Sequence, residues 1–379
     1  MTSMCSRERV VIALSHQEPD KVPIDIGEGR QTSIYVEPYV NTMQALGLGA
    51  PEIVASPRGV VDRFDERFLQ KLEIDFRRVA LRGVPEDQVA ESDGTFSDEW
   101  GIRWKKVGYF VSPVHHPLKD ATLDDLKRYR WPDPNDERRF KGVREEAEFK
   151  WQNTGYAMVA QQPNHTYGVL TEAIYLRGME NFFMDLIINK EFASALMGYV
   201  TDYHVRLYEN YLDAVGEFVN VVHTSDDLGA QAGPYMSLDM YREIIKPHER
   251  RFMSAIKNKT EAKILHHSDG AIASFIDDLI EIGVDILNPV QPSPEMDPPS
   301  LKKAFGGRIS FHGGIDQHRA LTSGTSDDVR EEVELRIRQL TPGGGYILAA
   351  AQTVMPEVPA ENVICMFETA RRKGRYPID

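Results

Sequence analysis

The chain has 379 residues, enough to bury a large core in one big domain or two ordinary ones. Its 44 Lys and Arg residues against 58 Asp and Glu residues give a formal net charge of −14, and no basic run is present, which argues against a nucleic-acid partner. The two cysteines, Cys5 and Cys365, exclude a disulfide framework, and the lack of a signal-peptide core or a long apolar run predicts a cytoplasmic protein without a membrane segment.

Strands and helices are predicted to alternate from the start of the chain. The first helix covers 6–17 with Ser6 as its N-cap, the first strand covers 22–27, and a helix over 36–48 precedes a strand over 72–80. Two alternating aromatic segments within 91–118 predict a hairpin, and the charged stretch that follows predicts a helical excursion. We therefore expect residues 81–153 to be an insertion on the main domain.

From residue 156 onward the alternation is regular. Strands are predicted at 156–160, 218–227, 262–267, 285–291, 308–316 and 344–352, and helices at 169–188, 190–214, 237–258, 271–282, 326–340 and 359–373. Eight alternating strands imply a parallel sheet with crossover helices, and this number favours a closed (β/α)8 TIM barrel over an open sheet. No Gly-x-Gly-x-x-Gly follows the first strand, which weakens a dinucleotide-binding alternative. We expect residues 1–379 to form one barrel domain.

Polar residues gather where the predicted strands end. The apolar strand that begins at Lys263 runs into His266, His267, Ser268 and Asp269, and alternation places His267 and Asp269 on one face. In a barrel, all carboxyl ends of the strands face a common mouth, so distant residues converge there. The candidate residues at this mouth are Arg30, Asp75, Arg77, His165, Tyr167, His223, Asp226, Asp227, His266, His267, Asp269, Gln291, His312, Asp316 and Gln352.

Two further features of the mouth leave alternatives open. Asp226 and Asp227 are adjacent, so they point to opposite faces. Such carboxylates suit metal binding or acid–base work, and a cap on the following loop explains the one that faces away equally well. Gly314 follows another glycine and would let a ligand approach the backbone closely, although a plain turn explains it as well.

Several segments resemble the uroporphyrinogen decarboxylase-like superfamily. They are Arg7 to Pro23, Asp226 to Ser237, His267 to Gly270, Ile282 to Gln291, Gly313 to Asp316 and Val358 to Asn362, spread in order over nearly the whole chain. The resemblance implies the same (β/α)8 barrel, a homodimer, and one of two chemistries.

The decarboxylases of this superfamily carry an arginine-rich loop and a late histidine. Here Arg30 alone remains in that loop, and Gln352 stands near the place of the histidine, so the resemblance is nearer to the other branch. That branch contains zinc-dependent methyltransferases, which bind zinc through His-x-Cys and a later Cys. In this sequence His267-Ser-Asp269 has that spacing, with Asp in place of the first Cys and Gln352 near the second.

The leading hypothesis is therefore a methyltransferase or demethylase that passes a methyl group between a small-molecule substrate and a corrinoid on a partner protein. The resemblance implies zinc held by His267 and Asp269, with His223, Asp227 or His266 as a third ligand and Asp226 or Asp227 assisting as ligand or base. The residues expected to contact the substrate are Arg30, His165, Gln291, Gly314, Asp316 and Gln352. Two alternatives stay open: a metal-free decarboxylase of a tetrapyrrole or small acid that uses Asp75, Arg30 and Tyr167, and a non-catalytic barrel that binds a corrinoid or tetrapyrrole.

Overall fold

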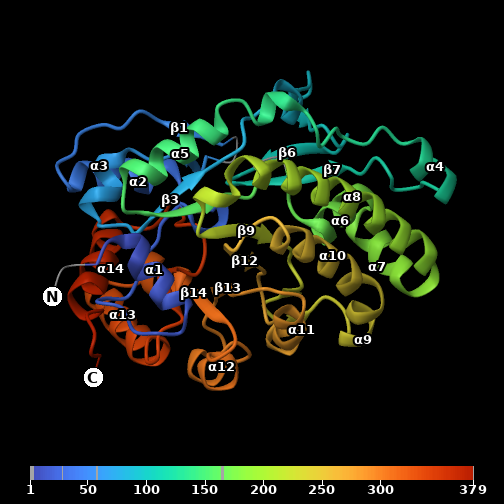
Figure 1. Ribbon diagram of the computed structural model, residues 1–379. Coiled ribbons are helices and arrows are strands. Elements are labelled where there is room, and N and C mark those ends of the chain that lie inside the picture. Colours follow the sequence, from blue (N-terminus) through green and yellow to red (C-terminus); the bar gives the residue numbers. More distant parts are fainter. Residues whose placement is uncertain (1–3, 28, 57–58, 164–165, 379) are drawn as a thin grey trace.

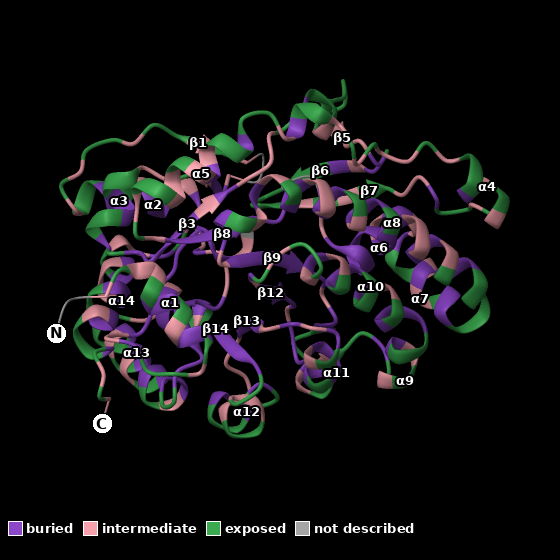
Figure 2. Ribbon diagram, viewed as in Figure 1, coloured by how far each residue is buried: buried purple, intermediate pink, exposed green. Residues whose placement is uncertain are grey.

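Seven parallel strands form the central sheet of the protein. A computed structural model describes residues 4–27, 29–56, 59–163 and 166–378. The strand order is β15-β14-β13-β12-β9-β8-β3, and the strands are β3 (Phe76–Val79), β8 (Ala157–Ala160), β9 (Val221–Ser225), β12 (Lys263–His267), β13 (Ile286–Val290), β14 (Ser310–Ile315) and β15 (Tyr346–Ala350). Nearly every residue in them is buried, as expected when helices cover one face and the barrel interior lies behind the other. Figure 2 shows this as a purple centre surrounded by helices with green outer faces.

Residues 22–26 occupy the position between the two ends of this sheet. On one side the Leu348 N–H donates to the Pro23 carbonyl over 2.9 Å, and the Asp25 N–H donates to the Leu348 carbonyl over 3.0 Å. On the other side the Asp75 N–H donates to the Ile24 carbonyl over 3.1 Å. The predicted first strand is therefore present only as an isolated bridge to β15, but it closes the curled sheet and confirms the barrel class.

Helix α1 (Ser6–Leu14) closes the amino end of the barrel. Its Val10 and Leu14 side chains join a buried apolar cluster whose other members come from the strands: Phe76, Ala157, Val159, Val221, Leu265, Ile286 and Ile347. The N-cap is Cys5, whose sulfur accepts from the Glu8 N–H, so the prediction of Ser6 as the cap is wrong by one residue.

The remaining helices surround the sheet (Figure 1). They are α2 (Val36–Ala45), α3 (Glu66–Lys71), α6 (Val169–Arg177), α7 (Met179–Ile188), α8 (Lys190–Val215), α9 (Leu238–Met240), α10 (Lys246–Lys257), α11 (Ile276–Glu281), α12 (Pro298–Phe305), α13 (Ser326–Leu340) and α14 (Ala360–Lys373). A π-helical turn over Tyr241–Ile245 joins α9 to α10, so the predicted helix over 237–258 is present with an irregular start. Within the described residues, no helix is long and apolar enough to cross a membrane.

The predicted hairpin is also present, between β3 and β8. Strands β4 (Val89–Ala90), β5 (Thr95–Ser97), β6 (Arg103–Val107) and β7 (Phe110–His115) form an antiparallel sheet, and α4 (Leu123–Arg128) and α5 (Val143–Asn153) follow it. The β6–β7 hairpin packs on α6 (Figure 1), where the Trp104 ring meets the Tyr175 ring edge-on with centroids 5.1 Å apart. Trp104 also stacks on Tyr167, which precedes this helix, with ring centroids 5.2 Å apart. Two further short pairs, β1 (Val54–Ala55) with β2 (Val61–Arg63) and β10 (Gly229–Ala230) with β11 (Gly233–Pro234), lie in loops.

Candidate functional site

Strand register brings polar groups together at the carboxyl end of the barrel. His267 ends β12 and pairs with Ser225 of β9 on one side and with Asn288 of β13 on the other. Because side chains alternate along a strand, His267 shares the inward face of Leu265, which belongs to the cluster inside the barrel. His266 faces outward and is buried, with its Nδ1 atom 3.0 Å from the Thr224 hydroxyl. Of the two histidines, His267 is thus the one directed into the barrel.

Three predicted residues form a compact group around His267. The Nε2 atom of His267 lies 3.5 Å from Oδ1 of Asp269 and 3.8 Å from Oδ1 of Asp227. The Asp269 N–H donates to Asp227 Oδ1 over 3.0 Å, which fixes the two loops relative to each other. In the described part of the chain, Asp227, His267 and Asp269 form the one group of three or more His, Cys, Asp or Glu side chains whose possible metal-ligand atoms all lie within 4.8 Å of one another. The His267 ring is buried, whereas 41% of the Asp227 side chain and 35% of the Asp269 side chain are exposed, so the group opens outward.

The charges in this group depend on one another. Burial disfavours the imidazolium of His267, but the carboxylates of Asp269 and Asp227 outweigh this and raise the pKa of His267 to about 9. Burial also acts to raise the pKa of Asp269, yet the neighbouring His267 charge lowers it below its ordinary value. For Asp227, burial and the nearby Asp269 charge together raise the pKa, against the effect of His267. The pair of carboxylates thus attracts positive charge to the Nε2 position.

Two amide side chains complete the group. The Nδ1 atom of His267 lies 2.6 Å from Oδ1 of Asn288, so Nδ1–H donates there and Nε2 is the nitrogen directed at the carboxylates. The Gln352 amide donates to Oδ1 of Asp269. The predicted proximity of Gln352 to the His267–Asp269 pair is therefore observed, whereas Asn288 had not been expected to take part. Its position opposite His267 on the neighbouring strand is the signal that would have identified it.

The group lies at the base of a cavity of about 520 Å³. Aromatic and amide side chains dominate its wall, namely Tyr35, Tyr109, Phe110, Tyr167, Tyr175, Tyr235, Gln31, Gln231, Gln291, Gln317 and Gln352. Tyr109 and Phe110 come from the tip of the β6–β7 hairpin, which the Tyr35 hydroxyl holds by donating to the Tyr109 carbonyl over 3.1 Å. None of the described wall residues is a lysine or arginine. The described part of the wall therefore offers a ligand aromatic faces and amide groups.

Two of the predicted residues are buried beside the cavity. Asp226 accepts a hydrogen bond from the Thr171 N–H over 2.7 Å, in the first turn of α6, so it caps that helix and does not line the cavity. His223 faces the barrel interior, one layer deeper than His267, and its ring packs against Gly29, where a Cβ atom would lie only 2.4 Å from its Cε1 atom. The structure therefore does not bring Asp226 and His223, predicted as a catalytic residue and a ligand, into the group around His267.

Asp75 is at the wrong end of the barrel for catalysis at the mouth. It precedes β3, is fully buried, and pairs with Nη1 of Arg9 in α1 over 2.5 Å. Its second oxygen accepts the Ile24 N–H over 2.9 Å. The expectation that Asp75 acts in the mouth is wrong, because the predicted strand began too early and so placed this residue within it.

Of the other predicted residues that the structure describes, two line the cavity and two lie away from it. Tyr167 and Gln291 line the cavity. Gly314 instead packs against Tyr346, and its carbonyl accepts from Arg336, while Asp316 accepts the N–H groups of His318 and Arg319 at the start of a π-helical turn. Gly314 and Asp316, predicted to contact the substrate, are thus not among the described residues that line the cavity. His165 and the side chain of Arg30 lie outside the described part of the chain.

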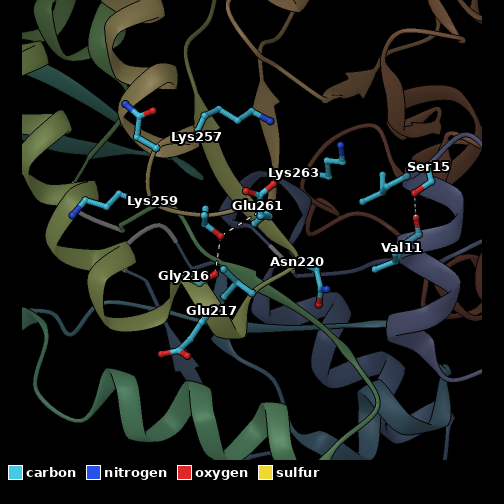
Figure 3. Close-up of a pocket in the computed structure, with 14 residues that line it drawn as sticks. Val11, Ser15, Gly216, Glu217, Asn220, Lys257, Lys259, Glu261 and Lys263 are labelled. Carbon is cyan, nitrogen blue, oxygen red and sulfur yellow. Dashed lines mark hydrogen bonds between the residues drawn. The ribbon is translucent and has the colours of Figure 1, made fainter.

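A second cavity, of about 580 Å³, lies at the amino end of the barrel between α1 and the start of β12 (Figure 3). Three lysines surround it, but each has an acidic partner: Lys259 pairs with Asp213 over 2.6 Å, and Lys257 and Lys263 both pair with Asp285. This cavity is also remote from the polar strand ends. The cavity above His267 is therefore the candidate active site.

Comparison with solved structures supports the fold. A methyltransferase from Methanosarcina mazei matches with a TM-score of 0.64 at 18% sequence identity, over 97% of this chain and 99% of that chain. A β-glycosidase from Thermosphaera aggregans matches over 93% and 97% of the two chains at 13% identity, but its TM-score is only 0.40. At 18% identity the match to the methyltransferase concerns the fold alone, and the match to the β-glycosidase carries no argument.

Comparison at the level of sequence gives the family. The search of curated proteins found no match. The sequence profile described as Uroporphyrinogen decarboxylase (URO-D) matches residues 111–373, from the second strand of the hairpin to the end of α14. Because this match covers more than half of the chain, the protein belongs to the uroporphyrinogen decarboxylase family.

Proposed function

We propose that this protein is a metal-dependent methyltransferase or demethylase, which passes a methyl group between a small-molecule substrate in the cavity and a corrinoid on a partner protein. The observation that carries the proposal is the Asp227–His267–Asp269 group at the base of the cavity. Membership of the family and the fold shared with a methyltransferase support it.

The donor atoms of this group fit a divalent metal ion. One imidazole nitrogen and two carboxylate oxygens form an open three-ligand set, which suits zinc and other first-row metals. The buried Nδ1–H of His267 has the acceptor that a metal-binding histidine normally requires. When bound, such an ion would act as a Lewis acid toward a heteroatom of the substrate.

The surrounding residues have separate roles in the proposal. His267, Asp227 and Asp269 hold the ion, and Gln352 orients Asp269 through its hydrogen bond. Tyr167 and Gln291 contact the substrate from the wall. When bound, a reduced corrinoid would supply the electron pair for the new bond to the methyl carbon, and the substrate heteroatom would keep the pair of the bond that breaks. The exposed edge of the cavity gives the corrinoid access.

The decarboxylase alternative has less support. An acid-rich tetrapyrrole needs several cationic side chains, and the described cavity wall contains no lysine or arginine. Asp75, one of its three expected working residues, lies at the opposite end of the barrel in an ion pair with Arg9.

Metal content tests the proposal directly. The untagged protein is supplied with zinc, freed of excess metal, and analysed beside Asp269→Ala and the control Asp316→Ala, which removes a carboxylate from a neighbouring strand end. We expect about one metal ion per chain in the wild type and the control and a loss in Asp269→Ala. Methyl transfer from candidate methylated substrates to free reduced corrinoid should be lost in parallel. A wild type that retains no metal, or an Asp269→Ala variant that retains it fully, would overturn the proposal.

A further inference from the structure

A chain of hydrogen bonds crosses the barrel interior behind His267. Oδ1 of Asn288 accepts from His267 Nδ1, and the Nδ2 amino group of Asn288 lies 2.7 Å from Nδ1 of His312. Nε2 of His312 lies 3.2 Å from Oδ2 of Asp25. The chain thus runs from β12 through β13 and β14 to the segment that closes the barrel.

The four side chains in this series of hydrogen bonds, those of His267, Asn288, His312 and Asp25, are each at most 4% exposed. Water therefore cannot replace any of the hydrogen-bond partners. In a buried chain each donor must meet an acceptor, because an unmatched group would carry its full desolvation cost. The orientation of each member is therefore determined by the orientation of the next.

The direction of the chain follows from Asn288. Its Nδ2 amino group, which can only donate, lies 2.7 Å from Nδ1 of His312, so Nδ1 accepts. The proton of the His312 ring is then on Nε2, which donates to Oδ2 of Asp25. Asn288 turns its amino group toward His312 and its oxygen toward His267. Nδ1 of His267 must therefore carry the proton.

We propose that Asp25, His312 and Asn288 are positioning residues that set the tautomer of His267 and so direct its Nε2 lone pair into the cavity for metal binding. The inference rests on the proposed metal site. Residues that do not line the cavity, up to three hydrogen bonds away from His267, thus determine which nitrogen of His267 binds the metal.

A pair of substitutions at Asn288 tests the acceptor. Asn288→Leu removes the acceptor for His267 and should weaken zinc binding about 10- to 100-fold in a competition titration with a fluorescent chelator. Asn288→Asp keeps an acceptor of the same shape and should bind zinc at least as tightly as the wild type. Thr224→Val, which removes the partner of the outward-facing His266, is the control and should leave zinc binding unchanged. Equal zinc affinity in Asn288→Leu and the wild type would overturn the proposal.

Nuclear magnetic resonance of selectively labelled histidine gives a readout that a purely structural role would not change. In both zinc-free and zinc-loaded wild type, the proton on Nδ1 of His267 should exchange slowly with water and show a cross-peak to Asn288. The proton should exchange rapidly in Asn288→Leu while circular dichroism remains that of the folded protein. A wild-type spectrum with the Asn288 amino group facing His267 would refute the assignment.

Asp25 tests the far end of the chain. Asp25→Asn keeps an oxygen that accepts from His312 and should retain zinc within about 3-fold, whereas Asp25→Leu should lose affinity toward the level of Asn288→Leu. If the wild type binds no zinc, the proposed function fails, but the Nδ1 proton signal of the zinc-free protein, recorded above the His267 pKa of about 9 where the ring is neutral, still decides whether the chain sets the tautomer. If the proton on Nδ1 of His267 exchanges with water at the same rate in Asp25→Leu and Asp25→Asn, Asp25 does not help to set the tautomer.

Discussion

The Gln352 side-chain amide donates a hydrogen bond to Oδ1 of Asp269, although the two residues follow different strands. This contact links the loop after β15 to the loop after β12 at the base of the cavity. The resemblance identified in the sequence puts thiolates near both positions. A carboxylate and an amide in their place make the donor set richer in oxygen and remove the soft sulfur ligands.

The first prediction concerns metal selectivity. Asp269→Cys should raise the affinity for Cd²⁺ relative to Mn²⁺ by about 10-fold or more, because a thiolate prefers soft ions. Asp269→Glu, which retains oxygen, is the matched variant and should leave the ratio near that of the wild type. Competition titrations with the two ions measure the ratio. An unchanged ratio in Asp269→Cys would mean that Asp269 does not contact the ion.

The second prediction separates the two adjacent aspartates. Asp227→Asn should weaken zinc binding at least 10-fold, because it removes a charged ligand, with little effect on unfolding. Asp226→Asn should retain zinc binding, since its amide oxygen can still accept the Thr171 N–H that Asp226 now accepts over 2.7 Å. Zinc titration and urea unfolding of both variants check this. The assignment is reversed if Asp226→Asn loses zinc and Asp227→Asn does not.

The third prediction concerns Asp75, which we regard as structural. Asp75→Ala leaves the buried Arg9 charge with Asp20 alone, which should lower the free energy of unfolding by about 3 kcal/mol. Zinc content and methyl transfer should be unaffected below the unfolding temperature. Asp75→Asn, which can still accept the Ile24 N–H, should be destabilised less. A folded Asp75→Ala protein without activity would restore Asp75 as a catalytic candidate.

The fourth prediction concerns pH and the buried Glu249. Burial raises the pKa of Glu249 to about 7, and Oε2 of this residue accepts from the Tyr241 hydroxyl over 2.6 Å. A carboxyl group whose pKa is raised by folding stabilises the protein fully below its unfolded pKa, near 4.5, and loses this contribution as the pH rises through about 7. The urea midpoint of the wild type should therefore fall between pH 5 and pH 8.

The matched variant for this prediction is Glu249→Gln. The glutamine cannot ionise, so the urea midpoint of this variant should change less over the same pH interval. An equally steep fall in the variant would mean that other groups cause the pH dependence. Glu281→Gln, at an exposed carboxylate on α11, serves as the surface control.

The sequence predicted those features that depend on local patterns. The helix over 326–340 is observed with the same bounds, since Thr325 and Asp328 form a capping box around an amphipathic segment. Helix α12 was missed because Pro298 and Pro299 resemble a break, although proline is favoured in the first turn of a helix. Asp227 and Asp269 were predicted at the strand ends because a sequence shows where an apolar run stops and polar residues begin, and because side chains alternate along a strand.

The remaining parts of the site depend on relationships between strands. Asn288 contributes because its strand pairs with β12 in one particular register, and no single segment encodes that register. Tyr109 and Phe110 reach the cavity because the hairpin packs on α6, which the aromatic pattern of the hairpin alone does not specify. Asp75 was misplaced by an error of a few residues at a strand boundary, which was enough to move it from one end of the barrel to the other.

The bridge between Ile24 and Leu348 also has a consequence for biosynthesis. The segment that closes the barrel leaves the ribosome early, whereas its partner strand is among the last parts to be made. Until then the edge of residues 22–26 that pairs with Leu348 and the edge of β14 that pairs with β15 have no partner strand, and such edges are templates for association with other chains. We therefore expect the nascent protein to need chaperone protection until translation is nearly complete, and truncation before β15 to give aggregation instead of a smaller folded barrel.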